Sequence, residues 1–598
     1  MPFFFSHSQN FSQLTMASKH FINDPTHLVA SALRSITLTN PNTAFDEENK
    51  VIYLRPDAAE PQVSVISGGG SGHEPSFAAF VGPGILSGAV AGTIFASPSA
   101  EQVRRCISQR VETSKGVLVV VMNYTGDVLN FGMAVEKAKA AGIECEMVVM
   151  GDDAGVGRAK GGKVGRRGIA GTVLIHKIAG ALAAAGGSLE EVHNAAQIVA
   201  DNTVSMGSSL AHVHVPGRKV EEEALKDTEV ELGMGIHNED GAERAEADLP
   251  TTVKTMLKYM LDQSDKDRAF SDISSSDQTV LLVNNLGGVS VLEMGGITTE
   301  VTTQLEKDYG IRPVRTLSGT FMTSLNGLGF SISLLRVSDL GVKQSLLELL
   351  DAPSEAAGWS AAVSSKTWNK PPSETRELAR DKTAENNPSG IQIDGAAATK
   401  ALDHALDRLI KVEPEVTRFD TVVGDGDCGI GLKRGAEGIK ARLGDISRQS
   451  DAALFLNEII SVVETTMDGT SGALYAIFLN SLAYGIRLQG NGGSKKADTK
   501  IWAAALKEAS TALEKYTPAK PGDRTLVDAL APFVEQLSST NDIQQAAKAA
   551  CEGAEKTKGM EASLGRTVYV GGSGFKEVPD PGAYGLAEFL SGLAEALK

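Results

Sequence analysis

The chain has 598 residues and carries a formal net charge of −17 at pH 7. A chain of this length exceeds what one hydrophobic core usually serves, so we expect several packed units. The negative charge argues against proteins that coat nucleic acids or anionic membranes, because both depend on basic patches. Any phosphate that the chain binds must therefore be held locally, by a metal ion or by backbone N–H groups.

The four cysteines are scattered without a Cys-x-x-Cys pair, and no secretory signal precedes them. No apolar run reaches the length of a membrane span. Residues 1–23 lack acidic residues, which leaves a weak transit peptide open, although they also lack arginine; Met16 is an alternative start. We therefore expect reduced thiols and a cytoplasmic protein.

The first half of the chain, up to about residue 350, alternates short β-branched runs with alanine-rich stretches, which is typical of an α/β protein. We place this unit at 17–350. A Ser-, Pro-, Glu- and Lys-rich segment follows, and it predicts a linker over 351–394. The predicted buried strands are 63–67, 116–121, 147–150 and 280–283.

The C-terminal part, 395–598, shows the spacing of amphipathic helices and no strand pattern. This favours an all-helical bundle or barrel. The predicted helices are 396–411, 452–466, 473–487, 501–516, 525–538, 542–557 and 583–597.

Two of the predicted strands run into segments with polar side chains. The strand at 63–67 is followed by Gly68–Pro75, read here as a glycine loop whose bare backbone approaches a small polar ligand and which contains His73. A flexible turn is the alternative. The strand at 116–121 is followed by Asn123–Asp127, where Asp127 is either a general base or the N-cap of a helix over 128–141.

The segment Gly233–His237 is a glycine-spaced turn that exposes an imidazole. A histidine with one ring nitrogen hydrogen-bonded keeps a lone pair on the other, and that lone pair can attack a carbonyl. The alternative is an ordinary surface histidine in a turn.

Three carboxylates, Asp420, Asp425 and Asp427, fall within eight positions around two glycines. Hard oxygen donors at this density suit Mg²⁺, and the later glutamate of an EF-hand loop is missing. A solvated acidic loop or a calcium site is the alternative. Further on, Gly469–Gly472 precedes the predicted helix from Ala473, and the backbone amides of such a helix start suit phosphate oxygens.

Taken together, segments of both halves resemble the ATP-dependent dihydroxyacetone kinases, also called glycerone or triose kinases. The resemblance runs from about residue 20 to the end. It implies a substrate-binding K domain of two α/β lobes followed by a helical-barrel L domain that holds ATP. The segments that carry it are 67–75, 123–127, 233–237, 424–429, 470–475, 521–528 and 580–584.

The resemblance also implies roles for individual residues. It makes His237 the nucleophile that holds dihydroxyacetone as a hemiaminal, and it places His73, Asp127 and the backbone of Gly70 on the substrate. It makes Asp420, Asp425 and Asp427 ligands of Mg²⁺. The ATP site that it implies is lined by Cys428, Gly429, Ile430, Gly431, Thr470, Ser471, Thr525, Leu526, Arg566, Asp580, Pro581 and Gly582.

The activity implied is phosphorylation of dihydroxyacetone, and of D-glyceraldehyde, by ATP in a homodimer whose K and L domains cooperate between subunits. An alternative within the family is formation of cyclic FMN from FAD at the L-domain site. A carbonyl-sensing regulator without kinase activity is a third reading, disfavoured by the three aspartates. Met122 departs from the family pattern, in which a lysine commonly reaches the substrate.

Overall fold

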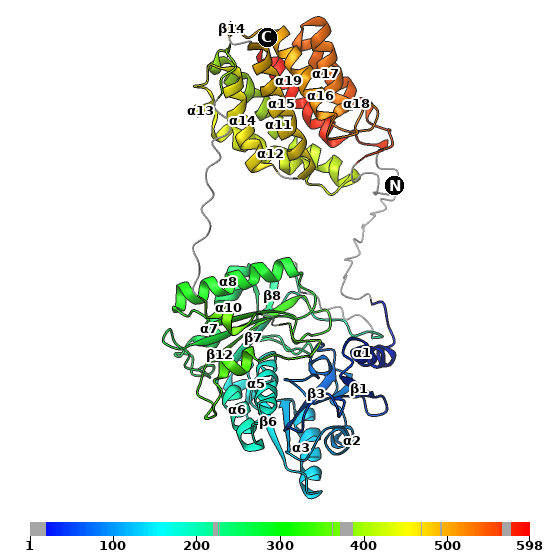
Figure 1. Ribbon diagram of the computed structural model, residues 1–598, viewed down its shortest axis with the longest axis vertical. Coiled ribbons are helices and arrows are strands. Elements are labelled where there is room, and N and C mark those ends of the chain that lie inside the picture. The colour runs from blue at the N-terminus through cyan, green and yellow to red at the C-terminus, as the bar shows by residue number, and fades with distance from the viewer. Residues whose placement is uncertain are drawn as a thin grey trace, which may run out of the picture. The chain divides into compact units, whose positions relative to one another are not determined.

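The computed structural model describes residues 20–218, 225–226, 228–360, 363–370, 387–467, 469–490, 493–564 and 576–598. The chain divides into two compact units, Met1–Glu374 and Thr375–Lys598. The first is an α/β unit and the second is mostly helical (Figure 1), which confirms the predicted fold class. Across the described residues, no helix combines the length and apolar character needed to cross a bilayer.

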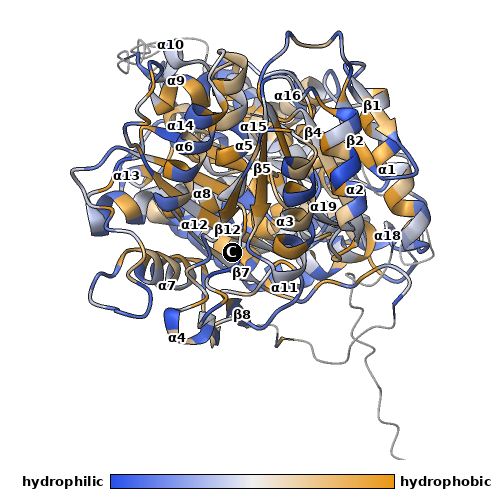
Figure 2. Ribbon diagram, turned by 90° about the horizontal axis from the view of Figure 1, so that it is seen from below, coloured by the Kyte–Doolittle hydropathy of each residue, from blue (hydrophilic) through white to orange (hydrophobic). Residues whose placement is uncertain are grey.

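The first sheet of the α/β unit has the strand order β1-β2-β4-β3-β5-β6, with β4, β3, β5 and β6 parallel. Its strands are β1 (Thr43–Asp46), β2 (Val51–Leu54), β3 (Ser64–Ser71), β4 (Gly88–Ile94), β5 (Val117–Met122) and β6 (Cys145–Met150). Every residue of β5 is apolar and buried, and this strand is orange in Figure 2. Such a strand requires cover on both faces.

Helices supply that cover. The cluster on one face joins the sheet to α2 (Ala100–Arg105) and α3 (Thr125–Ala140). The cluster on the other face joins it to α5 (Thr172–Ala184) and α6 (Leu189–Asp201), and it continues into a second sheet. Helices α5 and α6 therefore belong to a core that both sheets share.

The second sheet has the order β11-β10-β12-β7-β8-β9, in which β10 and β11 are parallel and the other pairs antiparallel. Its outer face packs on α7 (Leu249–Leu261) and α8 (Val291–Tyr309). Its strands are β7 (Thr203–Ser209), β8 (Glu229–Leu232), β9 (Glu243–Glu246), β10 (Thr279–Asn285), β11 (Arg315–Gly319) and β12 (Gly329–Arg336). The remaining α-helices of this unit are α1 (Pro25–Thr39), α4 (Arg158–Gly161), α9 (Leu346–Asp351) and α10 (Ser365–Trp368).

The four predicted strands coincide with β3, β5, β6 and β10 to within a few residues, but the glycine loop predicted after residue 67 is wrong. Strand β3 continues to Ser71, so Gly68, Gly69 and Gly70 are strand residues. Glycine is required here because the backbone of the neighbouring strand lies very close. A Cβ on Gly68 would lie 2.2 Å from Val90 O on β4.

Part of the predicted linker packs on the α/β unit. The backbone N–H of Glu355 donates to Pro83 O, and that of Gly358 donates to Ala79 O. The Trp359 ring lies 5.3 Å from that of Phe321, centroid to centroid.

The helices of the second unit pack in a closed ring, in the contact order α11-α19-α18-α17-α16-α15-α14-α12 and back to α11. They are α11 (Gly395–Val423), α12 (Cys428–Ala441), α14 (Ala452–Thr466), α15 (Gly469–Gly490), α16 (Thr499–Leu513), α17 (Val527–Thr540), α18 (Ile543–Lys556) and α19 (Pro581–Ala596), with the short α13 (Leu443–Ile446) beside them. Strands β13 (Ile391–Gln392) and β14 (Lys495–Lys496) form a two-residue parallel pair that the sequence did not predict.

Two helices differ from the prediction in a way that bears on the site. Helix α11 continues through Pro414 to Val423 instead of ending near residue 411, which places Asp420 on its last turn. Helix α12 was not among the predicted helices, and glycines such as Gly429 and Gly431 are poor helix formers. Gly429 is nevertheless suited to it, since a Cβ there would lie 2.7 Å from Thr417 N on α11.

Candidate active site

Two histidines far apart in the sequence meet in the α/β unit. His73 follows β3 and His237 follows β8, and their Nε2 atoms lie 3.0 Å apart. His73 is fully buried, and its Nδ1 lies 2.9 Å from Thr323 O. Burial, and after it the nearby charge of His237, lowers the pKa of His73 to about 3. His73 is therefore a neutral imidazole near pH 7, with Nδ1–H donating to Thr323.

His237 is fixed by the carboxylate of Glu239. Its Nδ1 lies 2.9 Å from Glu239 Oε1, and its backbone N–H donates to Oε2 at 2.9 Å. Burial raises the pKa of Glu239, but the hydrogen bond and charge of His237 outweigh burial and lower that pKa to about 2. The rings of Tyr124 and Phe95 stand edge-on to the imidazole, with centroids 4.7 and 5.1 Å away. The ring is thus held on several sides.

Asp127 is the third polar group here. It lies in the first turn of α3, whose N-cap is Tyr124, so the N-cap reading of Asp127 is wrong. The carboxylate is buried, and its Oδ1 has no hydrogen-bond partner among the described residues. Burial raises the pKa of Asp127, and a hydrogen bond from Ser97 and the charge of His237 partly oppose that rise. The combination is a carboxylate with a vacant acceptor near an imidazole.

Asp127 also borders β3, because a Cβ on Gly69 would lie 3.7 Å from Asp127 Oδ2. The next residue, Gly70, packs on the backbone of Phe95 and Ala96, where a Cβ would lie 2.7 Å from Ala96 N. Packing alone therefore requires glycine at position 70, and its contact with substrate stays a prediction. Met122 ends β5 with its side chain buried.

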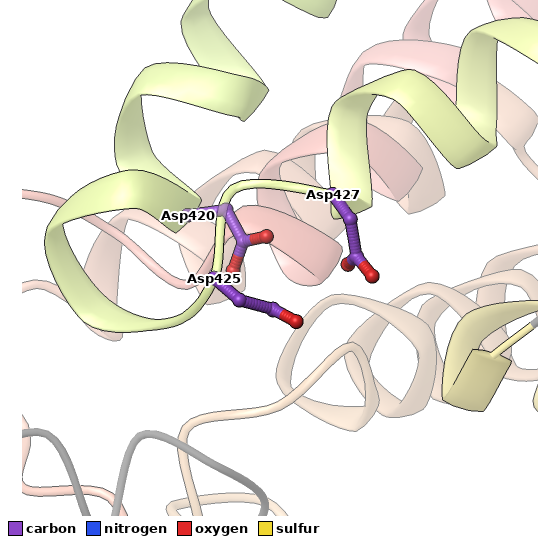
Figure 3. Close-up of side chains that lie close together, drawn as sticks. All are labelled: Asp420, Asp425 and Asp427. Atoms are coloured by element: carbon purple, nitrogen blue, oxygen red, sulfur yellow. The ribbon is translucent and has the colours of Figure 1, made fainter. Parts of the chain in front are cut away.

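In the helical unit, Asp420, Asp425 and Asp427 converge (Figure 3). One carboxylate oxygen from each lies within 4.8 Å of those of the other two. Asp420 is buried and accepts from Cys428 N–H at 3.0 Å, whereas Asp425 and Asp427 are exposed. The turn needs Gly426, which has a φ of 81°. Oxygens at ~2.1 Å from one Mg²⁺ are at most ~4.2 Å apart, so these three fit Mg²⁺ after a small inward shift.

The starts of several helices gather around this turn. Cys428 begins α12, and its Sγ lies 4.0 Å from Ser471 Oγ in the first turn of α15. Asp580 caps α19 by accepting from Ala583 N–H, and burial raises its pKa to about 7, with Asp420 among the charges that act on it. A Cβ on Gly582 would lie 3.6 Å from Leu526 Cβ, just before α17. Converging helix N-termini favour anions such as phosphate.

Of the remaining residues predicted to line the ATP site, those that the structure describes lie near these helix starts. Helix α15 begins at Gly469 rather than Ala473, so Thr470 and Ser471 are helical. Ile430 is exposed on α12 and Gly431 has open space at its Cβ position. Arg566 lies outside the described residues. The remaining predicted positions, Gly429, Thr525 and Pro581, lie on α12, before α17 and at the start of α19.

The residues predicted from the sequence did not include Glu239, Thr323 or Phe95. For Glu239 a signal existed, since a carboxylate two positions after a candidate nucleophile can hold its ring. Thr323 acts through its backbone carbonyl and Phe95 through its ring, and neither contact has a sequence signal.

Comparisons with known proteins agree with this architecture. A Dak1 domain matches residues 34–358 and a DAK2 domain matches residues 422–595. Dihydroxyacetone kinase 1 of Saccharomyces cerevisiae is 44% identical, over 97% of this chain and 100% of that protein. Triokinase/FMN cyclase of Homo sapiens is 37% identical, over 98% of this chain and 100% of that protein.

A solved structure extends the similarity to three dimensions. The crystal structure of the dihydroxyacetone kinase from C. freundii in complex with AMP-PNP and Mg²⁺ matches with a TM-score of 0.61 and 31% identity, over 97% of this chain and all of that chain. On these grounds, with both domains matched in order, the chain belongs to the dihydroxyacetone kinase family.

Proposed function

We propose that this protein transfers the γ-phosphoryl group of ATP to a terminal hydroxyl of dihydroxyacetone. The α/β unit binds the triose and the helical unit binds ATP with Mg²⁺. The observation that carries the proposal is the presence, in one chain of this family, of the His73–His237 pair and of the Asp420, Asp425 and Asp427 cluster. One group suits a carbonyl substrate and the other suits a metal–nucleotide complex.

His237 is proposed to hold the substrate covalently. Its Nδ1–H is donated to Glu239, so Nε2 is the atom that attacks the carbonyl carbon and forms a hemiaminal. Glycerol has no carbonyl and forms no such bond. Covalent capture therefore selects ketotriose over polyol without a tightly shaped pocket.

Asp127 is proposed as the general base. Its vacant Oδ1 can accept the proton of the terminal hydroxyl as that oxygen attacks phosphorus. His73 and the backbone of Gly70 are proposed to bind the substrate oxygens. Bound Mg²⁺ would neutralise charge on the phosphate oxygens. Cys428 to Gly431, Thr470, Ser471, Thr525, Leu526, Arg566 and Asp580 to Gly582 are proposed to line the nucleotide site.

ATP consumption with dihydroxyacetone, D-glyceraldehyde and glycerol, measured with Mg²⁺ and again after chelation, tests the proposal. We expect turnover with dihydroxyacetone, and also with D-glyceraldehyde, little with glycerol and none without metal. His237→Ala should remove the preference for carbonyl substrates. Full activity and unchanged rejection of glycerol in that variant would contradict the covalent role.

A second activity should be assayed with the same variants, because relatives named triokinase/FMN cyclase are 37% identical over 98% of this chain. We propose FAD cleavage to cyclic FMN as an additional activity of the helical unit. His237→Ala should leave it intact, whereas Asp425→Asn should abolish it. Loss in both variants, or in neither, would count against a shared metal site.

We further propose a homodimer in which the two kinds of unit from different subunits cooperate. Sedimentation of the full chain gives the mass. Mixing His237→Ala chains with Asp425→Asn chains should restore part of the kinase activity if cooperation occurs between subunits. No recovery in a dimer of mixed chains would contradict it.

A further inference from the structure

The turn that carries His237 is anchored independently of any ligand. Gly235 N–H donates to Glu239 O at 2.9 Å and closes the turn. Asn238, with a φ of 65°, donates to Val213 O at 2.8 Å and accepts from Val213 N–H at 2.9 Å. Glu239 therefore contacts the imidazole from a backbone that cannot shift without breaking these bonds.

Arg167 backs this arrangement. Its guanidinium donates to Gly233 O at 2.7 Å and to Asp153 Oδ2 at 2.9 Å. A Cβ on Gly235 would collide with both Glu239 Oε2 and Arg167 Nη1, so these two groups lie against the same stretch of backbone. The charge of Arg167 is among the influences that keep Glu239 ionised.

The proton count of the histidine pair follows from its neighbours. Thr323 O and the Glu239 carboxylate can only accept, so both Nδ1 atoms carry protons. Each ring therefore keeps its lone pair on Nε2, and the two Nε2 atoms lie 3.0 Å apart.

We propose that Glu239 is a positioning residue for His237: it orients the ring so that Nε2 faces His73 and the substrate carbonyl, and it balances the positive charge of the substituted ring. This inference rests on the proposed function, because it concerns how the proposed nucleophile is made competent. Glu239 itself does not touch the substrate.

The addition step balances with one proton from solvent. The lone pair of His237 Nε2 forms a bond to the carbonyl carbon. The C=O π electrons move to oxygen, which takes up one proton from solvent. His237, substituted at Nε2 and protonated at Nδ1, then carries one positive charge next to Glu239.

Glu239→Gln tests the proposal, with Glu595→Gln as a matched control. Glu595 also contacts a histidine, with Oε2 lying 3.4 Å from His404 Nε2, but it lies on the surface of the helical unit. Full-length chains labelled with ¹⁵N-histidine are mixed with [2-¹³C]dihydroxyacetone, and a one-bond ¹³C–¹⁵N coupling reports the hemiaminal. We expect the coupling in the parent and in Glu595→Gln, and its loss in Glu239→Gln.

Kinetics give a second readout. We expect kcat/KM for dihydroxyacetone to fall about 10- to 100-fold in Glu239→Gln, mainly through KM, because a hydrogen bond to a charged group is lost. An unchanged coupling and KM in this variant would overturn the positioning role. Absence of coupling in the parent would instead refute covalent capture by His237, whatever Glu239 does.

Thermal unfolding of each variant separates positioning from misfolding. If Glu239→Gln also unfolds at a lower temperature, Glu239→Asp decides. It restores the carboxylate, so partial return of the coupling and of the parent KM supports the proposal. Failure to recover either in a folded Glu239→Asp chain overturns it.

Discussion

Replacing Asp127 by asparagine changes one oxygen to an amide and leaves the shape of the side chain almost intact. The carboxylate is buried and sits in the first turn of α3, so it cannot be replaced by bulk water or by a neighbouring group. Its Oδ1 is vacant, which is the state required of a base that awaits a hydroxyl proton. Positioned general bases contribute roughly 10²- to 10⁴-fold. We therefore expect kcat to fall by that factor, or about 2.7–5.4 kcal/mol of transition-state stabilisation.

The pH dependence of the same variant provides an internal check. Burial raises the pKa of Asp127, and the base works only when ionised, so kcat of the parent should rise with pH through a pKa above 3.8 and then level off. In Asp127→Asn, kcat should no longer rise with pH in this range. A carboxyl with a raised folded pKa costs stability as pH rises above its unfolded pKa, so the variant should be no less stable than the parent at pH 7.

A coupled ATP assay between pH 4.5 and 8, with thermal unfolding at pH 7, measures both effects. The ¹³C–¹⁵N coupling should persist in Asp127→Asn, because the carbonyl addition does not need this carboxylate. Retention of kcat within tenfold of the parent, or an acid limb that survives the substitution, would refute the reasoning.

Three further substitutions follow from the packing. Asp425→Asn removes one of the converging carboxylates and should leave no turnover at Mg²⁺ concentrations that saturate the parent; parent-like turnover at those concentrations contradicts this. Gly70→Ala should lower the free energy of unfolding by about 1–3 kcal/mol, because its Cβ would lie 2.7 Å from Ala96 N. Gly132→Ala on α3 is the matched change, since its Cβ meets only Met147 at 3.9 Å; it should raise that free energy by about 0.5–1 kcal/mol. Urea unfolding compares the two glycine variants, and equal effects would show that close contact at β3 does not matter.

Features whose residues are close together in the sequence could be predicted from it. The Asp420, Asp425 and Asp427 cluster arises from one turn, so neighbours in the sequence are neighbours in space. Strand β5 was recognisable because burial on both faces leaves an unbroken apolar run. His73 and His237 are different, because they follow strands of two separate sheets, and no spacing of residues indicates their contact. Only the family resemblance placed them together.

Glycines explain why strand β3 differs from the predicted loop, and helix α12 has similar glycines. In both elements glycine meets close packing by neighbouring backbone and does not mark irregular chain. At Gly429 the crowding comes from α11, and at Gly68 it comes from the carbonyl of Val90 on β4. Crowding is a tertiary property, so a single sequence cannot distinguish such glycines from those of a loop.

The glycines of β3 also limit how this protein can diverge. Val90, Phe77 and the Phe95–Ala96 backbone already fill the space that side chains at positions 68, 69 and 70 would need. Divergence that keeps this strand intact must therefore occur at side chains beside it, such as Tyr124, since larger residues at positions 68 and 70 would collide with backbone atoms.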